Sequence, residues 1–244
     1  MNAHAQTVDL YRTKYQATQL GIITITLNSD WSEPLTNSQD DIDAAQRSMD
    51  FMLGWFADPI FKGDYPASMR QRLGNLLPRF TSAQKQLLLG SYDFFGLNHY
   101  TSEYVANEPN PSSDNPAGIM STRWDLLLAK VYEPIYNQFC SEKDGVPIGP
   151  VADSDWLYVV PWGIRKLLNY IHNTYNSPWI MITENGVDVP NEGSMPIAQA
   201  LNDTFRVNYY SSYLDNVAKA MNEDSVSIMG YFAWSLLVRI TQER

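Results

Sequence analysis

The chain has 244 residues, of which 44% are hydrophobic and 18% are charged. This length and apolar fraction suit a single packed domain, and they exclude a disordered tail, a collagen-like repeat and a disulfide-stapled miniprotein. The formal net charge of −10 argues against a nucleic-acid partner, because phosphate surfaces attract basic proteins.

The sequence contains no apolar run that is long enough to span a bilayer, and no secretion signal at its start. Its one cysteine, Cys140, has no partner for an internal disulfide and fits a reducing compartment. We therefore expect no membrane segment and a cytoplasmic location.

The first segments predict a helix, a strand and a second helix. The first helix ends before Gly21, and the β-branched run at residues 22–27 predicts a buried strand. Ser38 and Asp41 form a capping box that opens the second helix. The apolar faces of these two helices consist of Val8, Tyr11 and Tyr15, and of Ile42, Ala45, Met49, Met52 and Phe56.

The middle of the chain predicts another short helix, a strand and a long connection. Thr81 with Gln84 forms a capping box for the helix, and residues 93–100 form the second strand. Segment 107–118 is rich in Asn, Pro and Ser and predicts a loop. Segment 121–149 shows no clean period, which indicates an irregular connection.

The last third of the chain predicts two further helix–strand pairs. Pro161 opens a helix, and the third strand at 179–183 ends in Glu184-Asn185-Gly186. A long helix then precedes the fourth strand at 226–234. The two helical faces consist of Ile164, Leu167, Leu168, Ile171 and Tyr175, and of Leu201, Phe205, Tyr209, Tyr213, Val217 and Met221.

This alternation of helices and strands predicts a parallel sheet with crossover helices. Periodicity alone allows either an open doubly wound sheet or a (β/α) barrel. No glycine-rich phosphate loop follows any strand, which disfavours nucleotide binding.

Functional side chains of parallel α/β folds gather at the carboxyl ends of strands. Alternation places Asn98 and Tyr100 on one face of the second strand and His99 on the other. It also places Glu184 on the same face as the isoleucines of the third strand. A carboxylate in this position is a candidate nucleophile or base, and a surface turn or helix-capping glutamate is the alternative.

The histidines do not predict a ligand site. His99 faces the helical layer, where a core histidine is expected. His4 and His172 have no carboxylate or thiol at metal-ligand spacing. We expect neither a metal nor a cofactor.

The segment Ile182–Gly186 resembles the nucleophile signature of family 1 glycoside hydrolases, the retaining β-glucosidases. The resemblance extends from the start of the chain to about Leu237. Segments that resemble the same family, in the same order, are Gly54–Pro59, Gly63–Pro66, Leu77–Phe80, Asp93–Tyr100, Trp156–Tyr170 and Gly230–Leu237.

The resemblance implies a (β/α)₈ barrel in which the four predicted strands correspond to strands five to eight. Residues 1–244 are therefore expected to form a single incomplete domain, a half TIM barrel. By the same resemblance Glu184 is the nucleophile and Tyr100 its hydrogen-bond partner. Asn98 would reach a sugar hydroxyl, and Trp234 would form the floor of the pocket.

The sequence departs from the family pattern in two places. The family acid/base glutamate lies in a Thr-Phe-Asn-Glu-Pro-like motif at the fourth strand, before the region matched here. Asn107-Glu108-Pro109 repeats three of its residues, but it follows the second predicted strand and is interpreted as coincidence. After Leu237 the family continues with Asp-Asn-Phe-Glu-Trp, whereas Thr241 and Gln242 stand here at the positions of the Glu and Trp.

These departures predict a truncated β-glucosidase-like chain, a truncated isoform or an incomplete gene model, that is inactive or weakly active alone. We expect two open strand edges and an apolar inner face, and hence self-association or association with a full-length relative that it modulates. One alternative is a residual retaining β-glucosidase that uses Glu184. Another is a carbohydrate-binding module without turnover. The expected ligand is a β-glucoside or a glucose-like sugar.

Overall fold

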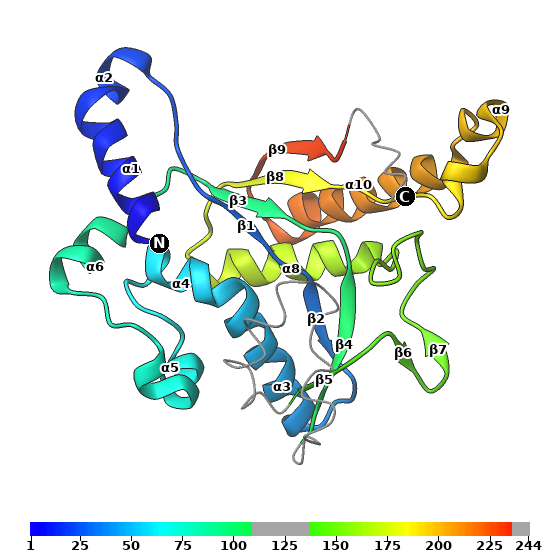
Figure 1. The fold of residues 1–244 in the computed structure, drawn as a ribbon, viewed down its shortest axis with the longest axis horizontal. Helices are drawn as coiled ribbons and strands as arrows, with labels where there is room; N and C mark the ends of the chain where they lie inside the picture. Colours follow the sequence, from blue (N-terminus) through cyan, green and yellow to red (C-terminus); the bar gives the residue numbers. More distant parts are fainter. Residues whose placement is uncertain (109–136, 236–244) are drawn as a thin grey trace.

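A four-stranded parallel sheet forms the centre of the molecule (Figure 1). The computed structural model describes residues 1–108 and 137–235. All four strands predicted from the sequence are present, and neighbouring strands run parallel, as predicted. In sheet order they are β1 (Thr26–Asn28), β3 (Phe95–Asn98), β8 (Ile180–Asn185) and β9 (Ile228–Ala233).

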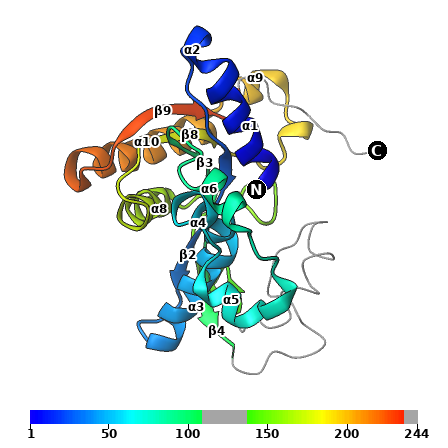
Figure 2. The same ribbon diagram turned by 90° about the vertical axis from the view of Figure 1, so that its left-hand side faces the viewer.

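Two long helices cover one face of this sheet. Helix α8 (Pro161–Thr174) begins with Pro161 in the first turn, as predicted, and α10 (Thr204–Asp224) begins after the Asp203 cap. The two helices lie side by side (Figure 2). They connect β3 to β8 and β8 to β9, so each is a crossover connection between parallel strands.

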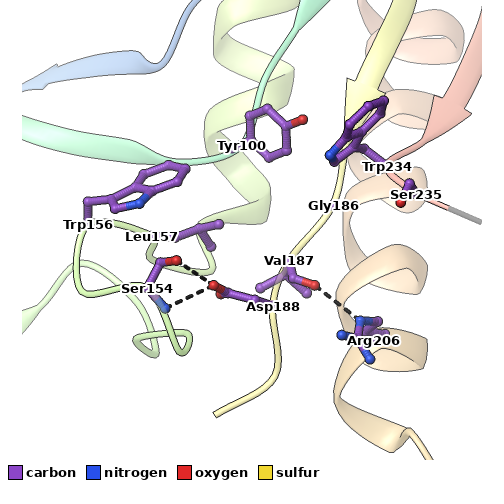
Figure 3. Close-up of a pocket in the computed structure, with 10 residues that line it drawn as sticks. All are labelled: Tyr100, Ser154, Trp156, Leu157, Gly186, Val187, Asp188, Arg206, Trp234 and Ser235. Carbon is purple, nitrogen blue, oxygen red and sulfur yellow. Dashed lines mark hydrogen bonds between the residues drawn. The ribbon is translucent and has the colours of Figure 1, made fainter. Parts of the chain in front are cut away.

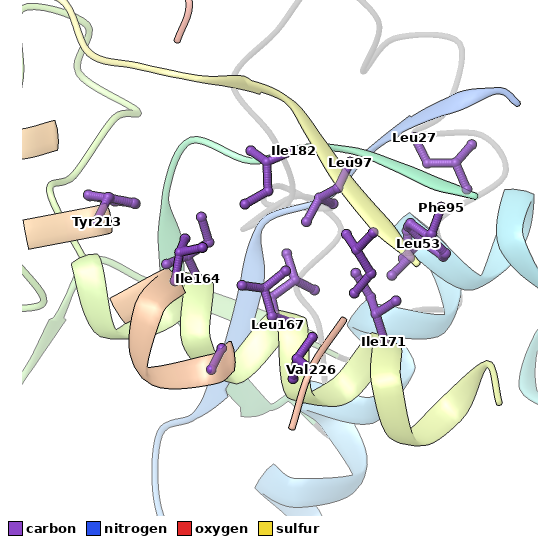
Figure 4. Packing of buried hydrophobic residues seen from close by; sticks show 14 of the residues in the cluster. Leu27, Leu53, Phe95, Leu97, Ile164, Leu167, Ile171, Ile182, Tyr213 and Val226 are labelled. Atoms are coloured by element: carbon purple, nitrogen blue, oxygen red, sulfur yellow. The ribbon is translucent and has the colours of Figure 1, made fainter. Parts of the chain in front are cut away.

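The core lies between the sheet and these helices (Figure 4). Leu27, Leu97 and Ile182 project from three neighbouring strands and are almost fully buried. They pack with Ile164 and Leu167 of α8, which have no exposed surface. The helical stripe predicted for this segment is therefore confirmed.

The opposite face of the sheet differs from the apolar surface that we expected. Thr26 and Asn28 of β1 are exposed, while Met181 and Thr183 of β8 are half-buried. Gly96 of β3 adds no side chain to this face. The expectation was wrong because alternation sends the leucine and isoleucine side chains to the helices and leaves threonine, asparagine, glycine and a single methionine on the described part of this face.

A second, three-stranded sheet was not predicted. It contains a parallel pair, β2 and β4, and an antiparallel strand, β5. Strand β5 lies in the segment expected to be irregular, and a short hairpin follows it. The bounds are β2 (Trp31–Pro34), β4 (Ser102–Asn107), β5 (Asn137–Cys140), β6 (Glu142–Lys143) and β7 (Val146–Pro147).

The remaining helices surround these sheets. The first predicted helix appears as two segments and ends at Gln19, before Gly21, as expected. Thr81 and Gln84 form both halves of their capping box. The bounds are α1 (Asn2–Lys14), α2 (Gln16–Gln19), α3 (Gln39–Met49), η1 (Asp50–Gly54), α4 (Trp55–Phe61), α5 (Ala67–Leu73), η2 (Gly74–Leu76), α6 (Ser82–Leu88), η3 (Glu192–Ser194) and α9 (Ile197–Ala200).

The structure at the start of α3 differs from the prediction in two details, the capping box and the apolar face of the helix. Asp41 N–H donates to Ser38, but the Asp41 carboxylate accepts from the backbone N–H groups of Thr36 and Asn107 instead of completing the box. These bonds place Asp41 on the buried face of the helix and leave Ile42 exposed. Phe56 is also exposed, because the π-helical turn η1 interrupts the predicted spacing.

Some predictions fall on residues that the structure does not describe. These are most of the 107–118 loop, part of the 121–149 connection, Pro109, and the C-terminal departure from the family pattern at Leu237, Thr241 and Gln242. Within the described part of the chain, no helix is long and apolar enough to cross a membrane.

Candidate active site

The candidate site lies at the carboxyl ends of β3 and β8, two adjacent parallel strands. Glu184 is near the end of β8 and lies opposite Asn98 in the strand register. Ile180 and Ile182 are fully buried, whereas Glu184 is half-buried. The prediction that Glu184 shares a face with the isoleucines was wrong, because register shifts after Leu97 and after Ile182 break the alternation.

A hydrogen bond joins the two central site residues. The Tyr100 hydroxyl donates to Oε2 of Glu184. Burial raises the pKa of Tyr100, and the neighbouring Glu184 carboxylate raises this pKa further. Tyr100 therefore remains a protonated donor, which fixes one carboxylate oxygen and leaves the other for chemistry.

Asn98 lies beside this pair. Its Oδ1 accepts a hydrogen bond of 2.7 Å from the Thr183 hydroxyl, so its amide nitrogen points away from Thr183. The sugar contact expected for Asn98 remains a prediction.

A cavity of about 620 Å³ opens next to Tyr100 (Figure 3). Tyr100, Trp156 and Trp234 form its aromatic walls. The rings of Tyr100 and Trp156 meet edge to face at 6.3 Å, and Trp234 is 56% exposed. Flat aromatic surfaces of this kind suit the apolar face of a sugar ring.

The polar wall of the cavity contains Ser154, Asp188 of the loop that follows β8, and Arg206 of α10. Asp188 accepts hydrogen bonds from the backbone and side chain of Ser154 (Figure 3). Arg206 of α10 donates to the carbonyl of Val187 and forms ion pairs with Glu192 and Asp203. These contacts attach the loop to α10 and give the cavity a defined wall.

Gly186 shows why a glycine follows Glu184 and Asn185. A Cβ at this position would lie 1.8 Å from the carbonyl oxygen of Trp234. The end of β8 can therefore approach the end of β9 only without a side chain here. This close approach brings Trp234 beside the site.

His99 lies behind the site, not in it. Its ring is fully buried, and Nδ1 lies 2.9 Å from the carbonyl of Ser29. Nε2 has no hydrogen-bond partner among the described residues, so the expected core histidine is paired at only one nitrogen. Burial lowers the pKa of His99 to about 4, although the Ser29 bond opposes this shift, and the ring is neutral at pH 7.

The repeated Asn-Glu-Pro sequence does not end a strand of the site sheet. Asn107 is the last residue of β4, which belongs to the second sheet. Its side chain accepts a hydrogen bond from Arg47 of α3. This placement is in keeping with the interpretation of the repeat as coincidence.

The described residues contain no group of three or more histidines, cysteines or acidic residues placed to hold a metal ion. The chemistry that the geometry supports is that of a positioned carboxylate beside an aromatic-walled cavity. Retaining glycosidases use such a carboxylate as nucleophile, together with a second carboxyl group about 5–5.5 Å away.

Sequence reasoning missed several residues of the site. Trp156, Asp188 and Arg206 line the cavity but stand in segments assigned to connections or helix. Asn185 and Tyr209 form a buried hydrogen bond behind Glu184. The sequence signal that could have identified Tyr209 was its polar hydroxyl on an otherwise apolar helical stripe. This stripe was interpreted as ordinary core.

Comparisons with known proteins show the family of this chain. The model of glycosyl hydrolase family 1 matches residues 1–242. Beta-glucosidase 42 of Arabidopsis thaliana is 48% identical over 236 residues, which cover 96% of this chain and 45% of that protein. Raucaffricine-O-beta-D-glucosidase of Rauvolfia serpentina is 45% identical and is covered over 42% of its length.

Solved structures give the same result. A rice β-glucosidase superimposes with a TM-score of 0.85 at 46% identity, and one from Trichoderma harzianum with 0.86 at 38% identity. Each comparison covers 96% of this chain and 47% of the other. The chain thus spans less than half the length of these relatives, and its fold is a partial (β/α) barrel. The chain belongs to glycoside hydrolase family 1.

Proposed function

We propose that Glu184 is the nucleophile of a retaining β-glucosidase site. The observation that carries this proposal is the hydrogen bond from Tyr100 to Glu184 at the carboxyl ends of β3 and β8. In the reaction, a Glu184 oxygen bonds to the anomeric carbon while the bond to the leaving group breaks. Tyr100 holds the carboxylate in place, and Asn98 and Trp234 contact the sugar.

The finer proposal concerns the polypeptide of residues 1–244 alone. We propose that it supplies the nucleophile but no acid/base carboxyl group. Without a proton donor, the leaving group must depart as an anion, which is slow for ordinary glucosides and faster for acidic phenols. The polypeptide would therefore act weakly, and only on activated aryl β-glucosides.

Hydrolysis of a series of aryl β-glucosides with leaving groups of increasing acidity tests this proposal. We expect rates that rise steeply with the acidity of the phenol, and loss of this activity in Glu184→Gln. The matched control is Glu223→Gln, a solvent-accessible glutamate in the last turn of α10 that pairs with Arg165. Activity that survives Glu184→Gln would remove Glu184 from the mechanism.

We also propose that the polypeptide associates through its strand edges. Within the described residues, β1 and β9 each pair with one neighbouring strand and leave their other edge unpaired. Phe232 of β9 is 56% exposed, and Ile22, just before β1, is 58% exposed. Open edges with apolar side chains favour pairing with another chain, either a second copy or a full-length relative whose rate it then modulates.

A carbohydrate-binding role without turnover is the second candidate. The aromatic walls formed by Tyr100, Trp156 and Trp234 support this candidate. Calorimetry with glucose separates it from catalysis. Glucose binding accompanied by no hydrolysis of any aryl β-glucoside would favour the binding role over the enzymatic one.

A further inference from the structure

A buried network of side-chain amide and hydroxyl groups lies directly behind Glu184. Asn185, the next residue, is completely buried. Its Nδ2 donates to the carbonyl of His99 at 2.7 Å and to the hydroxyl of Tyr209 at 2.8 Å. Its Oδ1 accepts from the hydroxyl of Tyr231 at 2.6 Å. Both amide hydrogens of Asn185 and one acceptor position of its oxygen are therefore hydrogen-bonded.

The direction of each hydrogen bond follows from its chemistry. The His99 carbonyl can only accept, so the Asn185 nitrogen must face it and the Asn185 oxygen must face Tyr231. The Tyr209 oxygen accepts from Asn185, which leaves its one proton for the carbonyl of Tyr100 at 3.3 Å. The alternative amide orientation would break these bonds.

The network connects four segments of the fold. Tyr209 comes from α10, Tyr231 from β9, and Asn185 from β8, while the His99 and Tyr100 carbonyls belong to the segment after β3. Two of these segments carry Glu184 and its partner Tyr100. The hydroxyl groups of Tyr209 and Tyr231, which lie outside the substrate cavity, thus set the position of the Glu184 segment relative to the Tyr100 segment.

Tyr209 and Tyr231 are both protonated at neutral pH. Burial raises the pKa of Tyr209 and of Tyr231 above the ordinary value, with neighbouring tyrosines contributing in the same direction. Both hydroxyls therefore remain protonated donors at neutral pH.

We infer that Tyr209 and Tyr231 are positioning residues, which act through the Asn185 amide to hold the Glu184 carboxylate against the Tyr100 hydroxyl. The role in catalysis rests on the proposed function of Glu184, but the geometric role does not. Removing either hydroxyl leaves the Asn185 amide incompletely paired, and it then has freedom to rotate. The end of β8 and the Tyr100 segment are then no longer held in a fixed position relative to each other.

Tyr209→Phe and Tyr231→Phe test this inference, with Tyr175→Phe as the matched control. Tyr175 is also a buried tyrosine whose hydroxyl donates one hydrogen bond, at 2.9 Å to Asp58, but it contacts neither Asn185 nor Tyr100. Each substitution keeps the ring and removes one oxygen. A similar loss of stability is expected in all three variants.

The first readout is the crystal structure of each variant. We expect the Tyr100 hydroxyl and the Glu184 carboxylate to lie beyond hydrogen-bond distance in Tyr209→Phe and Tyr231→Phe, and to remain bonded in Tyr175→Phe. An unchanged Tyr100–Glu184 bond in the first two variants would overturn the inference, whatever the activity of the chain.

The second readout is the hydrolysis of an activated aryl β-glucoside. We expect kcat to fall about tenfold in Tyr209→Phe and Tyr231→Phe with KM unchanged, because a small displacement of a reacting group has a large effect on rate. Tyr175→Phe should keep the rate of the unsubstituted chain. Equal effects in all three variants would show a merely structural role and refute the inference. An inactive unsubstituted chain would instead refute the proposed activity, and the crystal structures would still decide this inference.

Discussion

His99 illustrates how much a single side chain depends on its surroundings. The sequence placed it correctly in the helical layer, since alternation puts it opposite Asn98 and Tyr100. The sequence could not show that one ring nitrogen would bond the Ser29 carbonyl and that the other would be buried without a described partner. That difference depends on packing between segments that are distant along the chain.

The lowered pKa of His99 predicts a loss of stability in acid. Burial lowers this pKa from 6.5 to about 4. Between these pH values the His99 side chain is protonated in the unfolded chain but neutral in the folded chain. The contribution of His99 to the free energy of unfolding is therefore present above pH 6.5 and is lost as the pH falls through 4. We expect the free energy of unfolding to fall by up to about 3 kcal/mol from this group.

Urea denaturation at pH 7 and near pH 4 measures this effect. His99→Asn is the informative variant, because its amide nitrogen can replace Nδ1 as the donor to Ser29 and it does not titrate. Its free energy of unfolding should fall less between the two pH values than that of the unsubstituted chain. Equal losses would show that other groups cause the acid sensitivity.

The candidate site was predictable where a family motif named its residues, although strand alternation placed Glu184 on the wrong face. Tyr100 and Glu184 were paired by family resemblance, and the structure joins them by a hydrogen bond. Trp156 and Arg206 were not predictable as cavity residues, because they come from a connection and from a helix. Their place depends on how the chain folds around the carboxyl ends of the strands.

Strands and helices were predicted best where the residue pattern within one element is enough to identify it. The four strands of the central sheet lie in short runs of mainly apolar residues, and helix α8 has a regular apolar stripe. The sheet of β2, β4 and β5 was missed because its strands carry no alternating pattern. Its register joins Trp31 to Ser102 and Val105 to Phe139, residues that only the folded chain brings together.

Gly186 gives a prediction for the end of β8. An alanine Cβ there would overlap the Trp234 carbonyl, which is backbone and cannot rotate away. We expect Gly186→Ala to reduce the free energy of unfolding by about 1–3 kcal/mol and to change the fluorescence of Trp234. Urea denaturation monitored by fluorescence measures the loss of stability.

Gly193→Ala is the matched control for this change. A Cβ at Gly193 would meet no atom within 4 Å, so the same added methyl group has free space. We expect its stability to stay within about 0.5 kcal/mol of the unsubstituted chain. Comparable losses in both variants would refute the close-approach explanation for Gly186.

At the scale of the whole molecule, the central parallel sheet is covered by helices on one face and has two open edges within the described residues. The sequence predicted the edges, but it misjudged the inner face, which carries Thr26, Asn28 and Thr183. An inner face with these polar groups tolerates water better than an apolar one. In the association that we propose, the driving force would come from the edges and their apolar side chains rather than from the whole face.

Size-exclusion chromatography with light scattering tests association through β9. Phe232→Lys places a charge on the exposed edge, where lysine opposes strand pairing. We expect the unsubstituted chain to elute as an oligomer and Phe232→Lys to shift toward the monomer. The control is Leu201→Lys, an 81% exposed residue that lies outside the strand edges. A stable monomer of the unsubstituted chain at micromolar concentration would contradict the proposal.

The most direct measurement is covalent trapping of the nucleophile. The chain is incubated with a 2-fluoro β-glucoside that carries an activated leaving group, and peptide mass spectrometry locates the sugar. The account predicts one fluoroglucosyl ester on the carboxylate of Glu184 and none in Glu184→Gln. An unmodified chain, or a sugar attached to any other residue, would contradict it.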